Sequence, residues 1–555
     1  MVAPTVDFSI AGSSGSGNSE PIVVSNQIQI NINAQDAEGI AKVEAFIDNE
    51  KVGEDTTAPY QITIDVSGYA SKGVTSKLTD YVLRIDATDT SGNTSSTDQL
   101  INIVNETPLI TINFPGQNIN PELIEFYIFA STMDGELLSI AKVEPTDTSI
   151  TLSTTAEISD EEEYMLTFAE KFAAFYGETN ELATIQNIKR SSLQEINLKT
   201  NPRFPSNFFD RAFPEEFPIE GFWDENTTDF IALEANGFDY SSGGNACSCS
   251  PTTPENSIII SRYDDYGNLY VNQNVYLQVK NTDQLITSYA LLNKDVLVDN
   301  FSITPDLFSD EGITLENLEY PNIDLALSNH PILSIYLYEN ESDYSNNIFH
   351  INNPLANTEA SGAKINYWLN NNFYAYRTEL QYLKYRIEHT GKPNQSYNGR
   401  DWSVSHTFEN GTFMVDKNTA NEDFVGRIAL SDFFSRRSGG QATVLNGRDG
   451  TYRWNIVFDS QNNSAIKLPV IPVELEEWVF NDTYNNLSFA SPEDYDQRQV
   501  ELIRYVNMDS FEEYLQKIIK DNEKWYLISP VKESVYDNPS FWNQNYVYPN
   551  HFLIN

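Results

Sequence analysis

Cysteine is nearly absent from this chain of 555 residues, which has only Cys247 and Cys249. A disulfide across the single residue between them would depart from normal bridge geometry. Two thiolates would make half of a zinc site, but no second cysteine pair and no suitably spaced histidine accompanies them. The chain therefore does not depend on disulfides. We expect both cysteines on an exposed loop, because their neighbours include Gly243, Gly244 and Pro251.

Long apolar runs are also missing. No stretch approaches the roughly 18 apolar residues of a membrane-spanning helix, so no transmembrane segment is expected. Met1 is followed by Val-Ala-Pro-Thr-Val-Asp-Phe, without the basic and apolar regions of a signal peptide. Either a signal or lipoprotein leader, with its lipid anchor, has been replaced by Met1, or Met1 is native and the protein leaves the cell by another route, such as a phage-like or injection particle. We prefer the first explanation.

Basic residues are scarce, since 34 Lys and Arg stand against 80 Asp and Glu, a formal net charge of −46. The first 106 residues hold 5 basic and 15 acidic residues, so the acidity is spread along the chain. Such a field repels nucleic acid and anionic membranes, and we expect neither as a partner. It suits solubility or a saline habitat, and a calcium-rich surface is the alternative. With 40% hydrophobic and 12% aromatic residues, the composition is that of a folded chain.

Recognisable catalytic motifs are lacking too. The sequence contains no His-Glu-x-x-His, nucleophile elbow, P-loop, paired Cys-x-x-Cys or EF-hand loop. A glycosidase needs two carboxylates about 5 to 9 Å apart, and 80 acidic residues neither identify nor exclude such a pair. No catalytic residue is predicted, and an enzyme is the less favoured class.

The most regular pattern in the chain lies between Gly39 and Asp65. Apolar and polar side chains alternate from Ile40 to Ile47, which predicts a strand with one face in a core. Asp48-Asn49-Glu50 predicts a tight turn, because Asn and Asp tolerate left-handed backbone angles. Gly53, in the return strand, marks a bend or bulge.

Three motifs in and after this region resemble a known family. GIAKVEAFIDNE at 39–50, TTAPY at 56–60 and ATDTSGNTS at 87–95 are similar to the hairpin, the T-x-x-PY step and the segment before the last strand of bacterial immunoglobulin-like (Ig-like) domains. The resemblance covers residues 4–105 only. It implies a small antiparallel β-sandwich, of a kind found in secreted or surface bacterial proteins as a spacer or adhesive module.

Three residues around the turn of the third motif are candidate calcium ligands. Asp86, Asp89 and Asn93 offer side-chain oxygen atoms, the donors that calcium prefers. Turn chemistry shared by the family is the favoured alternative.

The whole chain is predicted to be mainly β and multidomain, with a few helices. The expected division is an Ig-like β-sandwich at 1–106, a β-rich region with one helix and a Pro-rich linker at 107–225, a sandwich-like domain at 226–360 and an aromatic-rich β domain at 361–555.

Two helices are predicted in these later regions. One runs from Ser159 to Gly177, where Ser159 and Glu162 form a capping box, although its first residues also fit a strand. The other is amphipathic, runs from Ser510 to Lys524, and should pack on a sheet. Residues 373–389 fit either a helix or strands.

The window 377–453 differs in charge from the rest of the chain, with 11 Lys and Arg against 9 Asp and Glu. Guanidinium groups suit carboxylate or sulfate, and aromatic faces suit sugar rings or cations. We therefore name Trp402, Arg436, Arg437 and Trp454 as candidate binding residues for an anionic glycan or an acidic partner. The alternative, which we favour, is that the arginines of this window pair internally with the surplus acids.

The leading functional hypothesis is an extracellular or cell-surface bacterial binding or adhesion protein. Its partner would be a glycan or a surface protein, with the Ig-like domain as spacer and the region from residue 107 as the binding part. Two alternatives stay open: a structural fibre or spike component of a phage-like particle, and a carboxylate-dependent hydrolase. No cofactor other than calcium is expected.

Overall fold

Strands dominate the structure, a computed structural model that confirms the predicted mainly β class. It describes residues 3–11, 21–69, 81–114, 123–174, 177–198, 212–222, 232–237, 240–242, 257–262, 272–280, 286–298, 301–319, 332–352, 357–358, 364–382, 384–392, 402–433, 451–476, 478, 480–481, 486–487, 497–521 and 523–537.

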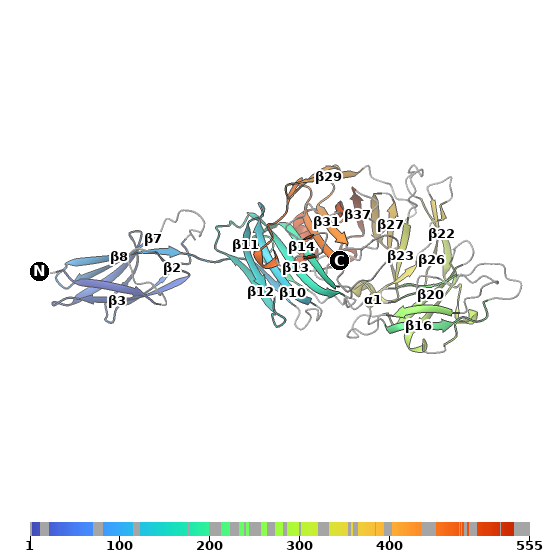
Figure 1. Cartoon of the computed structure of the whole chain (residues 1–555), viewed down its shortest axis with the longest axis horizontal. Coiled ribbons are helices and arrows are strands. Elements are labelled where there is room, and N and C mark those ends of the chain that lie inside the picture. Colours follow the sequence, from blue (N-terminus) through green and yellow to red (C-terminus); the bar gives the residue numbers. More distant parts are fainter. Residues whose placement is uncertain are drawn as a thin grey trace.

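The N-terminal part is a sandwich of two sheets, and it lies at one end of the molecule (Figure 1). One sheet has the order β1-β3-β6 and the other β2-β8-β7-β4-β5. All neighbours are antiparallel except β2 and β8. The strands are β1 (Thr5–Ile10), β2 (Ile22–Val24), β3 (Gln27–Gln35), β4 (Ile40–Ile47), β5 (Glu50–Asp55), β6 (Gln61–Asp65), β7 (Tyr81–Asp89) and β8 (Thr94–Ile103).

The hairpin predicted in this domain has the expected local chemistry. Asp48 and Asn49 connect β4 to β5 with φ of 45° and 71°, the left-handed angles that these residue types tolerate. The register shifts so that Ala45 faces Gly53, which places a bulge in β5. A Cβ on Gly53 would lie 2.4 Å from Cγ2 of Ile62 in the other sheet. Glycine therefore allows the two sheets to approach at this point.

The sandwich is self-contained. Its core cluster consists of residues between Ile10 and Ile103, with none from the rest of the chain. Asn105 marks the exit: its amide donates to the carbonyls of Val66 (2.7 Å) and Tyr69 (2.9 Å), and its Oδ1 accepts from the Asn26 N–H (2.9 Å). The chain thus leaves the sandwich at a fixed place.

The rest of the chain is built on one sheet of twelve strands, in the order β11-β10-β13-β14-β32-β31-β36-β37-β28-β27-β23-β24. Pairing is antiparallel except between β14 and β32. Its strands are β10 (Leu123–Thr132), β11 (Leu137–Lys142), β13 (Glu163–Ala174), β14 (Gly177–Lys189), β23 (Ile332–Tyr338), β24 (His350–Asn352), β27 (Ala375–Tyr382), β28 (Tyr385–Thr390), β31 (Val425–Phe433), β32 (Thr451–Asp459), β36 (Gln497–Tyr505) and β37 (Val531–Tyr536).

Smaller sheets accompany the large one, in the orders β12-β9-β15, β16-β19-β18, β17-β20-β21, β22-β26-β25, β29-β30-β33 and β34-β35. Their strands are β9 (Thr107–Asn113), β12 (Ser149–Thr154), β15 (Glu195–Asn197), β16 (Ala212–Pro218), β17 (Ala232–Ala235), β18 (Tyr240–Ser242), β19 (Ser257–Arg262), β20 (Asn274–Lys280), β21 (Ile286–Asn293), β22 (Ile313–Glu319), β25 (Asn357–Thr358), β26 (Lys364–Asn370), β29 (Ser403–Glu409), β30 (Thr412–Asn418), β33 (Ala465–Lys467), β34 (Phe480–Asn481) and β35 (Asn486–Leu487).

The described helices are short. They are η1 (Lys294–Val296), η2 (Pro305–Leu307), α1 (Glu341–Asn346), α2 (Val473–Glu476), α3 (Phe511–Tyr514), the π-helix η4 (Leu515–Lys520) and α4 (Trp525–Ile528). In the described part of the chain, none is long and apolar enough to cross a membrane.

The prediction of a helix from Ser159 to Gly177 is wrong. Residues 163–174 form β13, which pairs with β10 on one side and β14 on the other. Side chains from Tyr164 to Glu170 are buried on both faces of the sheet, so the apolar positions include those of a helical stripe. One arm of the predicted capping box does form, because the Ser159 N–H donates to Glu162 Oε2 (3.3 Å), but it closes a turn.

A helix does follow Ser510, which caps it because the Glu513 N–H donates to Ser510 Oγ (3.2 Å). Its second half is the π-helix η4 rather than a continued α-helix. Its apolar stripe packs in a core cluster with Val457 and Ile503 of the large sheet, as predicted. Of residues 373–389, which fit either a helix or strands, 375–382 form β27 and 385–389 belong to β28, and these two strands pair antiparallel.

The predicted division of residues 107–555 stays a proposal. The large sheet takes strands from each of the three regions: β10 from the first, β23 from the second and β32 from the third. A core cluster that runs from Phe217 to Ile387 also spans the proposed boundaries. If the regions are domains, they share a sheet.

Because its core is self-contained, we expect residues 1–106 to fold alone as an all-β fragment, and Gly53→Val to destabilise that fragment by about 1–3 kcal/mol through overpacking against Ile62. Urea unfolding followed by circular dichroism measures the free energy of unfolding.

Gly68→Ala is the matched control, because nothing lies within 4 Å of a Cβ at Gly68. A strongly helical spectrum of the fragment would contradict the sandwich, and equal loss of stability in the two variants would contradict the Ile62 contact.

Candidate functional site

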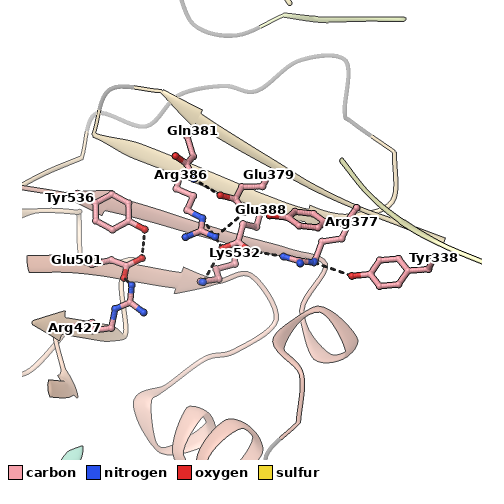
Figure 2. A network of polar contacts seen from close by, with 11 residues as sticks. Tyr338, Arg377, Glu379, Gln381, Arg386, Glu388, Arg427, Glu501, Lys532 and Tyr536 are labelled. Carbon is pink, nitrogen blue, oxygen red and sulfur yellow. Dashed lines mark hydrogen bonds and ion pairs between the residues drawn. The ribbon is translucent and has the colours of Figure 1, made fainter. Parts of the chain in front are cut away.

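The arginines of the window 377–453 whose side chains the structure describes gather on one face of the large sheet. Arg377 lies on β27, Arg386 on β28 and Arg427 on β31. Each meets a carboxylate from its own or a neighbouring strand, and Figure 2 shows the resulting network. The face is polar because alternate positions on five adjacent strands carry charged side chains in matching register.

Glu388 is the centre of this network. Its carboxylate accepts hydrogen bonds from Arg377 Nη1 (3.2 Å) and Lys532 Nζ (2.9 Å), and it forms an ion pair with Arg386 Nε (3.2 Å). Arg386 Nη2 also contacts Glu379 Oε2 (2.9 Å). One carboxylate thus joins three cations from β27, β28 and β37.

Aromatic side chains extend the network on both sides. Arg377 donates to the Tyr338 hydroxyl (3.2 Å), and its guanidinium lies 3.9 Å from the Tyr336 ring centroid. On the other side, Glu501 pairs with Arg427 and accepts from the Tyr536 hydroxyl. These contacts bring together strands that lie far apart in the sequence.

The network is buried, and its cations keep the Glu388 carboxylate in the charged form. Burial alone would raise the pKa of Glu388, but Arg386, Lys532 and Arg377 together lower it to about 2. Burial and the Glu379 carboxylate raise the pKa of Tyr336 above its ordinary value. A general acid or base works best with a pKa near the operating pH, which neither group has. We therefore interpret this network as architecture, the alternative that the sequence favoured for the arginine surplus.

Both candidate binding tryptophans lie in the core. Trp402 is 5% and Trp454 1% exposed, and the Trp454 indole donates to Thr184 Oγ1 (2.9 Å). Neither ring offers a face to a ligand. Arg436 and Arg437 lie outside the described residues, so their role in binding stays a prediction.

Cys247 and Cys249 also lie outside the described residues. Their expected position on an exposed loop stays a prediction.

The candidate calcium ligands are engaged with protein groups. Asp89 accepts from the main-chain N–H groups of Ser91 (2.8 Å) and Asn93 (2.9 Å) and from the Asn93 amide (2.7 Å). The Asn93 hydrogen bond lowers the pKa of Asp89. Asp86 instead pairs with Arg84 (3.1 Å). The three side chains form a turn and an ion pair, and in the described residues no group of three or more His, Cys, Asp or Glu side chains is placed to hold a metal.

One arrangement was not foreseen from the sequence. His350 is buried, with Nδ1 2.6 Å from the Tyr240 hydroxyl and Nε2 2.8 Å from Glu339 Oε1. The Tyr276 N–H donates to the same hydroxyl (2.9 Å). An acid, an imidazole and a phenol in series resemble a proton relay, but Tyr240 and His350 are packed in the core, away from solvent. No local sequence motif predicts this contact, because only the tertiary fold brings Tyr240 close to His350.

The central role of Glu388 is testable by substitution. Glu388→Gln leaves three buried cations short of one charge, and we expect it to cost about 3–5 kcal/mol of unfolding free energy at neutral pH. All 7 tryptophans follow residue 106, so tryptophan fluorescence in urea reports on this part of the chain and not on the N-terminal sandwich. Asp134→Asn, in an exposed pair with Lys467 (3.7 Å), is the control and should change little.

The same substitution has an expected pH dependence. Because the folded pKa of Glu388 is below its ordinary value of 4.5, its stabilisation is complete above that value and is lost as the pH falls towards 2. The stability difference between the native protein and Glu388→Gln should shrink over this interval. A difference that stays constant from neutral pH to pH 3 would contradict the ion-pair interpretation.

Comparison with known proteins adds a family for the N-terminal sandwich. The family described as bacterial Ig domain matches residues 16–96. No curated protein matches the chain.

The solved structures that match this chain resemble it over a short segment or with a low TM-score. Fibronectin(III)-like modules of Clostridium thermocellum CbhA match with 18% identity, 18% of this chain, 98% of that chain and a TM-score of 0.13. A Bacteroides ovatus protein of a mixed-linkage glucan utilization locus, in complex with a heptasaccharide, matches with 12% identity, 62% and 84% coverage and a TM-score of 0.14. A Ca²⁺-stabilized ice-binding adhesin of an Antarctic bacterium matches with 9% identity, 71% and 99% coverage and a TM-score of 0.15.

TM-scores this low carry no argument about function. The family match agrees with the resemblance seen in the sequence motifs and with the two-sheet fold of β1 to β8. Over residues 16–96, this chain has a bacterial Ig domain.

Proposed function

We propose that this chain is an extracellular or cell-surface bacterial binding protein that acts in adhesion. The observation that carries the proposal is the bacterial Ig domain, which has its own core and a fixed exit at Asn105. Domains of this kind serve as spacers or adhesive modules on bacterial surfaces, as the resemblance implies. The partner would be a glycan or a surface protein.

The rest of the described chain supports a binding role over a catalytic one. The polar network described above is buried and centred on Glu388, which pairs with cations of the same chain. In the relay of Glu339, His350 and Tyr240, the imidazole and the phenol are also buried.

The test is location followed by attachment. Antibodies raised against the purified chain should label intact cells of the source bacterium, and external protease should abolish the label. Deletion of the gene should reduce attachment of those cells to their substratum, and the intact gene should restore it. Label that appears only after lysis would contradict the proposal, and a stable trimer by light scattering would favour the fibre or spike alternative.

A further inference from the structure

The Ig domain itself has a surface suited to a ligand. We propose that the depression over Asn31, Asn33 and Gln61, on the outer face of the β1-β3-β6 sheet, binds a neutral, hydroxyl-rich glycan. The proposal rests on the proposed surface function and gives the domain a role beyond that of a spacer.

The outer face of this sheet is unusually rich in amides. In β3 every inward position is apolar, while every outward position is Asn or Gln and is exposed. The neighbouring outward positions come from β1 and β6, and none carries Lys or Arg. The outward residues are Thr5, Asp7, Ser9, Gln27, Gln29, Asn31, Asn33, Gln35, Gln61, Thr63 and Asp65.

The solvent-facing surface of the opposite sheet has a different composition. There, Glu44 pairs with Lys42 (2.8 Å) and Lys51 (2.5 Å), and Arg84 pairs with Asp86 (3.1 Å). The amide face has no Lys or Arg to form such pairs, and all its β3 positions are amides. This composition sets it apart from the opposite face of the same domain.

The amide face is also hollowed. A depression of about 390 Å³ lies over its part remote from the exit at Asn105. Phe8 and Ile32 belong to its lining, but they alternate with outward residues and so meet it through their main chain. The remaining lining residues are Asp7, Ser9, Asn31, Asn33, Pro59, Tyr60 and Gln61.

Hydrogen bonds within the face leave amide NH₂ groups that could donate to a ligand. Gln61 Nε2 donates to Asn31 Oδ1 (2.8 Å), and Gln35 Nε2 donates to Asn33 Oδ1 (3.3 Å). Each asparagine oxygen therefore accepts one hydrogen bond and keeps a second lone pair, and both NH₂ groups can donate to other acceptors. Hydroxyl and ring oxygens of a sugar are such acceptors, and the exposed Pro59 ring gives an apolar wall for sugar C–H groups.

Charge selects among glycans. The face carries Asp7 and Asp65 and no cation, and the first 106 residues have 5 basic against 15 acidic residues. An anionic polysaccharide would be repelled, whereas a neutral one meets only hydrogen-bonding groups. Because no ion pair forms, salt should affect the binding little.

The experiment is affinity electrophoresis of the full chain in native gels that contain hydroxyethyl cellulose or dextran as neutral probes, or polygalacturonate as the anionic probe. We expect at least one neutral probe to retard the protein, at low and at high salt. The double variant Asn31→Ala, Asn33→Ala should weaken this binding at least about tenfold, since two hydrogen-bond donors are lost. Circular dichroism checks that the variant keeps its fold.

The matched control is Gln27→Ala, Gln29→Ala, which changes the same strand and the same face outside the depression and should bind as the native protein does. The inference is overturned if neither neutral probe retards the protein, or if the Asn31, Asn33 variant binds normally. Salt-sensitive binding to polygalacturonate would overturn it in favour of Arg436 and Arg437. Loss of self-association in that variant would make the face a contact between two copies. Surface labelling decides the proposed function separately.

Discussion

The cost of burying charge is the constraint on which the large sheet depends. Glu388 is stable inside the protein only because Arg377, Arg386 and Lys532 surround it. Two of these cations come from strands on either side of β28, and the third from β28 itself. A slip of one residue in either pairing would turn a charge into the apolar core on the other face. The ion pairs therefore specify the register of β27, β28 and β37 as well as contributing to stability.

The two parts of the molecule are organised in opposite ways. The N-terminal sandwich closes its core between Ile10 and Ile103, and its strands are joined mainly by short connections. The large sheet instead interleaves distant segments, as where β14 pairs in parallel with β32. A unit of the first kind can be varied on its surface without disturbing the rest. The proposed binding surface therefore lies on a unit whose core is separate from that of the large sheet.

The basic residues of the window 377–453 show that composition does not reveal where a side chain lies in the fold. Arginine beside aromatic residues is what a glycan-binding surface would contain, yet Arg377, Arg386 and Arg427 are buried against glutamates. Trp402 and Trp454 fill the core of the same sheet. The amide face, by contrast, carries Asp7 and Asp65 but no cation. Its lack of ion pairs between acidic and basic side chains becomes meaningful only beside the ion-paired face of the opposite sheet.

The sequence by itself determined the Ig domain, because its signals are local. The alternation from Ile40 to Ile47, the left-handed turn at Asp48-Asn49 and the bulge at Gly53 each depend on neighbours within a few residues. Only the tertiary structure decided that residues 163–174 form a strand, because burial on both faces reproduces the apolar spacing of a helix and the choice rests with β10 and β14. It also decided which acids neutralise which arginines, since the energy of a buried ion pair depends on the segments that meet and not on their distance along the chain.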